Sequence, residues 1–329
     1  MPCMNVEDSI RYWFETLENQ GEYIQIHIWC KNRKTLKEEE FVYSHAQVDG
    51  IAAINCMMKE KGMEQLDLIP KIPKRHIPGL GTQFLLFLKY LSRLPFWSVP
   101  WTLPKTNWKP GRNPEAPSSK SWKMLSLKDS DLIRKQAKKN NVHLNTYLLY
   151  CLDQSLSAYY KSLTKKRVWL IPVSLRYEQQ KQYDKNITGF VDAYLIQKKS
   201  LQKLNDEIKN SLLKGDAFGG HFGVGIGRFI GKTLLGFLVK SNHYMQVRTG
   251  VFTNLGSWGE HKEEVDYDWA GLPPVIRSQP VGALTATYHG HMLLAFQFHP
   301  VLSRDPQLAQ KVIESWIQIL IAGPDSKEF

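Results

Sequence analysis

Hydrophobic residues recur at two different spacings along this chain, and the change of spacing predicts where helices and strands lie. Residues 6–17 place apolar side chains three and four positions apart, which indicates an amphipathic helix. Residues 22–30 and 38–46 instead alternate apolar and polar side chains on either side of a polar turn, which is typical of two antiparallel strands. Helical spacing returns after Gly50. The stretch FVYSHAQVDG at 41–50 is therefore expected at a junction between a strand and a helix.

The second half of the chain repeats this mixture of spacings. Two helices are expected within residues 126–160, with Asn145 or Thr146 capping the second one. Further strands are predicted at 168–176, 187–197, 250–258, 282–290 and 291–300, and further helices at 201–215 and 305–320. Strands and helices alternate irregularly, which predicts an α+β fold with a mixed sheet rather than a doubly wound parallel sheet.

A proline-rich region separates the two halves. Residues 67–123 contain nine prolines around an apolar helix predicted at 81–94, which is typical of a linker that also covers a core. A chain of 329 residues is long enough for one large or two medium domains. We therefore place the domain boundary at residue 110 and expect domains at 1–110 and 111–329.

Composition narrows the class of partner. The 43 Lys and Arg residues exceed the 31 Asp and Glu residues by 12, which favours phosphate-bearing partners. No long basic tail is present, so we expect no nucleic-acid partner. The four cysteines are far apart and form no CxxC pair, which argues against a disulfide framework or a structural zinc site. With no secretory signal and no long apolar span in the sequence, we expect a cytoplasmic protein.

The residues of FVYSHAQVDG leave three roles open for His45. It could act as a general base, since its side chain titrates near neutral pH, with Asp49 fixing the local geometry. It could instead bind a metal together with Asp49, but the sequence shows no further ligands nearby, so no metal is predicted. It could also be an ordinary core histidine.

SHAQVDG resembles the HxxxDG motif of the CoA-dependent and carrier-protein-dependent acyltransferase superfamily. This superfamily includes chloramphenicol acetyltransferase, condensation domains, wax ester synthases and alcohol acetyltransferases. Later segments resemble its other features in the same order, namely RVWLIPVSLR, ITGFVDAYL, VFTNLGSWG and YHGHMLLAFQFHPVLSRD. The resemblance covers residues 41–320 and implies two chloramphenicol-acetyltransferase-like lobes with mixed sheets flanked by helices.

The resemblance also implies a chemistry. His45 would take the proton of a hydroxyl or amine acceptor, which then attacks the carbonyl of an acyl-CoA or acyl-phosphopantetheine thioester; no cofactor would be bound permanently. Asp49 would be structural and would pair with Arg176. Gly50 would leave room for the thioester arm, as a residue without a side chain can. Asn254 would contact the developing oxyanion.

Three departures from the family pattern keep alternatives open. Ser44 stands where many members have a first His, and Asp192 stands where the condensation pattern has Asn. His45 is preceded by 44 residues, so the N-terminal lobe is expected to be abbreviated, with part of the acceptor channel either missing or supplied by another chain, for instance in a homodimer. The alternatives are an inactive relative that binds a partner or lipid, and a condensation-type enzyme that uses a carrier protein.

A glycine-rich stretch at 215–238 does not match a phosphate-binding loop, because Ile226 stands where that motif needs Gly. The stretch is apolar and basic, so it is expected either to cover the core or to lie on a lipid surface. A lipid-like substrate and peripheral membrane contact would suit the second alternative. His289 and His291 flank Gly290 and are expected in a hairpin turn rather than in a metal site.

Overall fold

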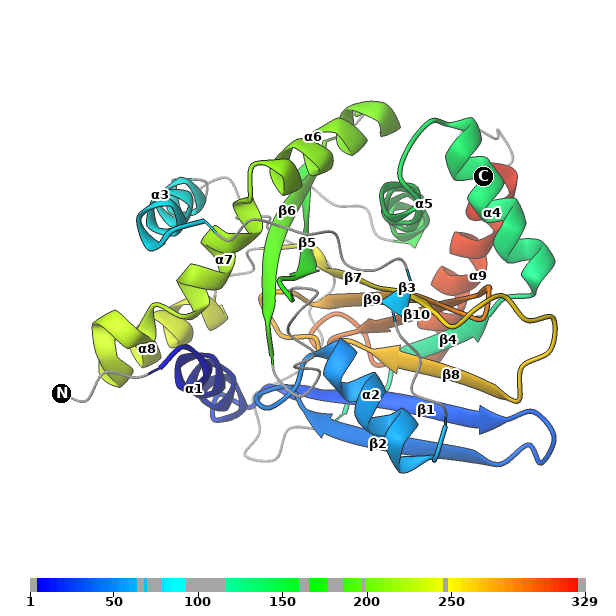
Figure 1. Cartoon of the computed structure of the whole chain (residues 1–329), viewed down its shortest axis with the longest axis horizontal. Helices are drawn as coiled ribbons and strands as arrows, with labels where there is room; N and C mark the ends of the chain where they lie inside the picture. Colours follow the sequence, from blue (N-terminus) through cyan, green and yellow to red (C-terminus); the bar gives the residue numbers. More distant parts are fainter. Residues whose placement is uncertain are drawn as a thin grey trace.

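The structure of the chain is a computed structural model that describes residues 5–63, 68–69, 78–92, 116–159, 166–176, 186–196, 199–244 and 248–324. Two sheets lie one above the other, and helices flank them on several sides (Figure 1). This arrangement confirms the predicted α+β class. The boundary that we predicted at residue 110 lies outside the described residues.

The smaller sheet has the strand order β2–β1–β8, with both pairs antiparallel. Strands β1 (Gln25–Asn32) and β2 (Glu38–Ser44) form the hairpin that the sequence predicts. Strand β8 (Tyr267–Leu272) was not predicted. Because β8 belongs to the second half of the chain and pairs with β1, the smaller sheet combines residues from both halves.

Within the described residues the larger sheet has seven strands, six of them in the order β4–β10–β9–β7–β5–β6, while β3 pairs with β7. Strand β7 runs parallel to β5 and β9, and the other pairs are antiparallel, so the sheet is mixed as expected. Its strands are β3 (Leu68–Ile69), β4 (Lys120–Met124), β5 (Lys166–Ser174), β6 (Thr188–Ile196), β7 (Gly250–Trp258), β9 (Val281–Tyr288) and β10 (His291–Phe298).

Each face of the larger sheet packs on a different apolar core. Successive side chains of a strand point to opposite faces, so Leu294 and Phe296 enter one core while Leu293 and Ala295 enter the other. The first core is covered by α4 (Leu127–Lys139), α5 (Leu144–Tyr159), α6 (Leu201–Leu213) and α9 (Pro306–Ala322). The second is closed by the smaller sheet and α2 (Gly50–Glu60). Burial on both faces explains the nearly continuous apolar sequence of β9 and β10.

Four further helices pack beside strand β6 and the smaller sheet (Figure 1). They are α1 (Val6–Glu18), α3 (Leu80–Leu91), α7 (Asp216–Val224) and α8 (Gly227–Tyr244). Helix α7 crosses α3 closely, since a Cβ at Gly219 would lie 2.7 Å from the backbone of Leu86. Helix α8 is interrupted at Gly231, which has a φ of 73° that favours glycine, and it packs on α1 through Leu235 and Val239.

The predicted cap of α5 is wrong. The helix begins at Leu144, so Asn145 and Thr146 lie inside its first turn. Their side chains bond to distant residues instead, since the Thr146 hydroxyl donates to Asn205 at 3.3 Å and Asn145 accepts a hydrogen bond from Asn254. Tertiary contacts therefore replace the local capping that the sequence suggested.

Among the described residues no single helix is long and apolar enough to cross a membrane. Helix α7 and the segment Gly227–Ser241 satisfy the criteria of length and composition only as a pair, and they are bent by 68° relative to each other.

Candidate functional site

His45 lies in the tight turn between β2 and α2, as the change of spacing predicts. Strand β2 ends at Ser44, whose carbonyl accepts hydrogen bonds from the backbone N–H groups of Gln47 and Val48. The Nδ1 atom of His45 lies 2.8 Å from the carbonyl oxygen of Val48. A carbonyl can only accept, so Nδ1 carries the proton and Nε2 keeps its lone pair in the neutral ring. Nε2 makes no hydrogen bond to any residue that the structure describes.

The surroundings of His45 favour the neutral imidazole. The side chain is half-buried, and the ring of Phe14 lies 4.5 Å from it, centroid to centroid. Burial lowers the pKa of His45, and this effect outweighs the hydrogen bond to Val48 and the charge of Asp49, both of which raise it. At neutral pH the ring is therefore in the form that can accept a proton.

Asp49 caps α2 and pairs with Arg176, so the structure brings together the two residues that the resemblance pairs. The Asp49 side chain accepts the N–H of Ala52 at 3.1 Å, as an N-cap residue does. Its two oxygens each lie 2.8 Å from a terminal nitrogen of Arg176. Both side chains are almost completely buried, at 5 % and 2 % exposure. A pair of this kind holds the β2–α2 turn against the end of β5.

Two further donors saturate the Asp49 carboxylate. The backbone N–H of Ile187 and the hydroxyl of Thr188 bond to its Oδ2 atom at 3.2 and 3.1 Å. Nearby, the side-chain amide of Asn186 donates to the carbonyl of His45 at 3.3 Å. Asp49 is therefore fully occupied as an acceptor, which suits a structural role and leaves His45 as the group of this turn with a free lone pair.

Gly50 is explained by packing within the chain. A Cβ at this position would lie 3.0 Å from the side chain of Leu255 on β7. The start of α2 thus approaches the larger sheet more closely than a side chain would comfortably permit. The role that we predicted for Gly50, clearance for a thioester arm, stays a prediction.

Asn254 lies on β7, and its side chain bonds to residues outside this turn. Its side-chain amide donates to Asn145 of α5, and its carbonyl oxygen accepts the N–H of Gly256 at 2.7 Å. The second bond spans an irregularity in the β7–β9 pairing, at which Gly256 has a φ of 78°. Asn254 therefore faces the helices of the first core, whereas the next residue, Leu255, faces Gly50.

Asp192, which departs from the condensation pattern, has a buried partner. Its Oδ1 atom lies 2.7 Å from Nε of Arg248, and both side chains are 4 % exposed. Arg248 also donates to the hydroxyl oxygen of Tyr90 at 2.9 Å. An Asp at this position therefore supplies the negative charge that the buried guanidinium requires.

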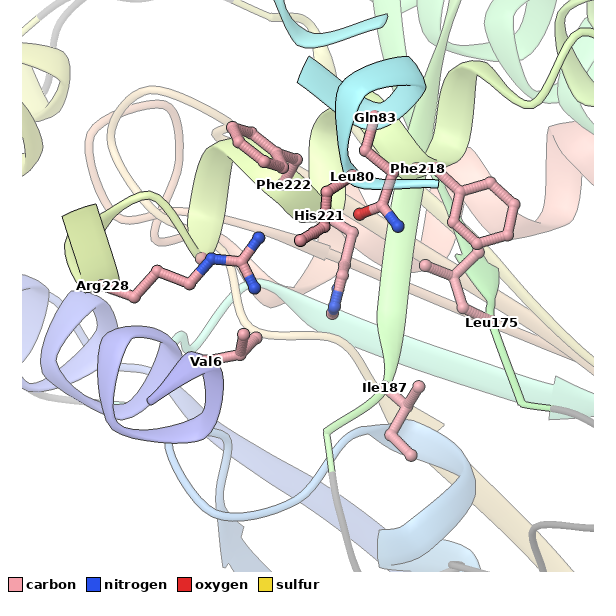
Figure 2. Close-up of a pocket in the computed structure, with 10 residues that line it drawn as sticks. Val6, Leu80, Gln83, Leu175, Ile187, Phe218, His221, Phe222 and Arg228 are labelled. Carbon is pink, nitrogen blue, oxygen red and sulfur yellow. The ribbon is translucent and has the colours of Figure 1, made fainter. Parts of the chain in front are cut away.

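A cavity of about 230 Å³ lies next to the Asp49–Arg176 pair. Leu175 and Ile187 form part of its wall, and the backbone N–H of Ile187 bonds to Asp49. His221, Arg228 and Gln83 supply its polar groups (Figure 2). His221 and Arg228 were not predicted as site residues; their signal in the sequence is that they are the two polar side chains of the otherwise apolar stretch 217–231.

Within the described residues no cluster of three or more His, Cys, Asp or Glu side chains could hold a metal ion. His289 and His291 lie in and after the β9–β10 turn, as expected, and each Nδ1 bonds to a backbone carbonyl.

No family model and no curated protein matches this sequence. Solved structures do match its fold. A trichothecene 15-O-acetyltransferase from Fusarium sporotrichioides superposes with a TM-score of 0.60 and 10 % identity, over 87 % of this chain and 66 % of that one. Polyketide synthase associated protein 5 from Mycobacterium tuberculosis has a TM-score of 0.54 and 13 % identity, over 97 % and 90 % of the two chains.

The condensation domain of the monacolin K polyketide synthase MokA is similar as well, with a TM-score of 0.51 and 14 % identity. The match covers 87 % of this chain and 69 % of that one. At such low identity the likeness concerns the fold alone. The chain has the fold of this acetyltransferase and of this condensation domain, which confirms the fold that the motifs implied.

Proposed function

We propose that this chain is an acyltransferase that moves an acyl group from a CoA or carrier-protein thioester to a hydroxyl or amine acceptor. The observation that carries the proposal is the state of His45. Its Nδ1–H is bound to the carbonyl of Val48, and its Nε2 lone pair has no hydrogen-bond partner among the residues that the structure describes. This is the arrangement that a general base requires.

The reaction needs one base and no covalent enzyme intermediate. Nε2 of His45 takes the proton of the acceptor as the acceptor oxygen or nitrogen attacks the thioester carbonyl. The tetrahedral intermediate then expels the thiolate, which takes the proton back from the imidazolium. General-base catalysis of this kind contributes roughly 10²–10⁴ in rate, and alignment of two bound substrates contributes more.

Asp49 and Arg176 support this chemistry without entering it. Their buried pair fixes the turn that carries His45, and four hydrogen bonds together with the ion pair to Arg176 occupy both oxygens of Asp49. No oxyanion donor is assigned, since Asn254 is engaged with Asn145 and Gly256.

We further propose that the substrate is lipid-like and that the protein works at a membrane surface. Helices α3 and α8 support this, because they carry large apolar side chains that are between 40 % and 66 % exposed, namely Leu80, Phe84, Leu85, Leu88, Phe229, Leu234, Phe237 and Leu238. Lys232 and Lys240 of α8 are exposed among them and would attract anionic lipid. Sedimentation with vesicles that contain phosphatidylserine should capture the protein, and Phe237→Asp should release it.

A carrier-bound thioester is the alternative donor. Two of the similar structures support that alternative, since one is a condensation domain of a polyketide synthase and the other is a polyketide synthase associated protein. A catalytically inactive protein that uses this fold to bind a partner is the remaining alternative.

Release of free thiol tests these proposals. The purified chain is mixed with acyl-CoAs or with an acyl-loaded carrier protein, and with alcohol and amine acceptors. His45→Ala should lower the rate by about 10²–10⁴. The matched control is His143→Ala, which removes an exposed imidazole at the start of α5 and should leave the rate unchanged. Turnover with the loaded carrier alone identifies the condensation-type enzyme, and no thiol release with any donor favours the inactive alternative.

A further inference from the structure

The cavity beside the Asp49–Arg176 pair is lined by helices α1, α3, α7 and α8 and by the ends of β5 and β6, which are far apart in the sequence. Its apolar wall consists of Val6, Leu80, Leu175, Ile187, Phe218 and Phe222. The Arg228 guanidinium, the His221 imidazole and the Gln83 amide point into the same space (Figure 2). An apolar chamber with a few converging polar groups is the usual form of a small-molecule site.

Arg228 is held in place without being neutralised. Its guanidinium carbon lies 5.2 Å from the ring centroid of Phe222 and 4.5 Å from that of Phe229. It forms no salt bridge in the part of the chain that the structure describes, and its buried Nε atom has no hydrogen-bond partner. The two rings orient the cation but supply no acceptor for its N–H groups. A buried donor without an acceptor costs free energy, which a bound anion would recover.

The groups around Arg228 do not supply that anion. Asp49 is bound to Arg176, and Asp216 of α7 is bound to Lys89 at 2.6 Å. His221 donates its Nδ1–H to the carbonyl of Thr188 at 3.1 Å, so Nε2 is an acceptor. Burial, together with the charge of Arg228, lowers the pKa of His221. The cavity therefore combines one positive charge with a neutral imidazole.

We propose that this cavity binds an amphiphilic anion. A carboxylate or phosphate group would accept hydrogen bonds from Arg228. The forked N–H groups of a guanidinium can pair with two oxygens of either group. The attached apolar chain would lie along Leu175 and Phe218. A volume of about 230 Å³ is below the range of drug-sized pockets, so the ligand is small or only one end of it enters. Binding here does not depend on whether His45 is a catalytic base.

Calorimetric titration of the full chain with octanoate, octyl phosphate and octanol tests the proposal. At least one of the two anions should bind more tightly than octanol, and Arg228→Gln should weaken that binding about tenfold or more, which corresponds to about 1.4 kcal/mol. The matched control is Lys209→Gln, which removes one exposed charge from α6 and should leave binding within about twofold. Preference for octanoate or for octyl phosphate identifies the head group.

Two outcomes would overturn the proposal: neither anion binds at concentrations up to about 10 mM, or Arg228→Gln binds the anions as the wild type does. If Arg228→Gln does not fold, Leu80→Trp tests the proposal instead. Leu80 is 61 % exposed, so the variant should fold, and a larger side chain there would narrow the cavity and weaken binding of the anions. Undiminished binding by Leu80→Trp would then refute the site. Failure of thiol release with intact anion binding would bear on the proposed function alone.

Discussion

His45 and His221 are two imidazoles in the same hydrogen-bonded state but in opposite electrostatic surroundings. Each donates its Nδ1–H to a backbone carbonyl and keeps an Nε2 lone pair. The charge of Asp49 raises the pKa of His45, whereas the charge of Arg228 lowers the pKa of His221 further. The imidazolium that forms when a base takes a proton is therefore tolerated better at His45.

His45 and His221 are therefore suited to different roles. A nearby carboxylate suits a proton acceptor, while a nearby guanidinium suits a site that stays neutral and binds an anion. Thr188 connects the two, since its hydroxyl donates to Asp49 and its carbonyl accepts from His221.

Arg176→Ala should lower the free energy of unfolding by about 3–5 kcal/mol, because it leaves Asp49 buried without its counter-charge. Urea denaturation measures the loss. Arg33→Ala is the matched control, since Arg33 pairs with Asp268 where both side chains are partly exposed, and it should cost less than about 1 kcal/mol. Equal losses in the two variants would show that the buried pair does not hold the His45 turn.

Gly219→Ala should cost about 1–3 kcal/mol, because the new Cβ would push α7 away from the backbone of Leu86 on α3. Those two helices form one side of the His221 cavity, so octanoate or octyl phosphate should bind less tightly as well. Gly81→Ala on α3 is the control, since nothing lies within 4 Å of a Cβ there. Unchanged stability and binding in Gly219→Ala would contradict the close crossing.

Asn254→Ala should lower stability by about 0.5–1.5 kcal/mol, the net worth of a typical hydrogen bond. Because its side chain faces α5, the rate of thiol release should stay within a few-fold of the wild type. A loss of rate comparable to that of His45→Ala would restore Asn254 as a donor to the oxyanion.

The smallest expected effect is a loss of stability in mild acid. Burial lowers the pKa of both His45 and His221 from the usual 6.5. Below pH 6.5 the unfolded chain therefore binds more protons than the folded one. The free energy of unfolding decreases as the pH is lowered, until the pH is below the pKa values of the two histidines in the folded state. Urea midpoints at about pH 7.5 and about pH 5 measure the trend. A midpoint that rises in acid would contradict the lowered pKa values.

The local features of the fold could be predicted from the sequence, because they depend on the spacing of apolar side chains over a few residues. The β1–β2 hairpin, the junction at His45 and the start of α2 at Gly50 all follow from alternation and helical period. Strands β4 and β8 were missed, since KSWKM and YDWAGL are short and lack a clear alternation. The caps proposed for α5 failed because Asn145 and Thr146 bond to residues far along the chain.

The cavity could not be predicted, since it exists only where α1, α3, α7 and α8 meet the ends of β5 and β6. No spacing in the sequence brings Val6 and Gln83 to Arg228. The Asp49–Arg176 contact, in contrast, was reached through the resemblance of two motifs, and its partners Ile187 and Thr188 were not foreseen.

The dependence of thiol release on pH tests most directly whether neutral His45 is the proton acceptor. We expect the wild-type rate constant to be level near neutral pH and to fall below pH 6.5, because burial lowers the pKa of His45 and protonation removes the Nε2 lone pair. His45→Ala should be slow and should lose this acid limb. A His45→Ala variant that keeps both the rate and the acid limb of the wild type would show that another group accepts the proton.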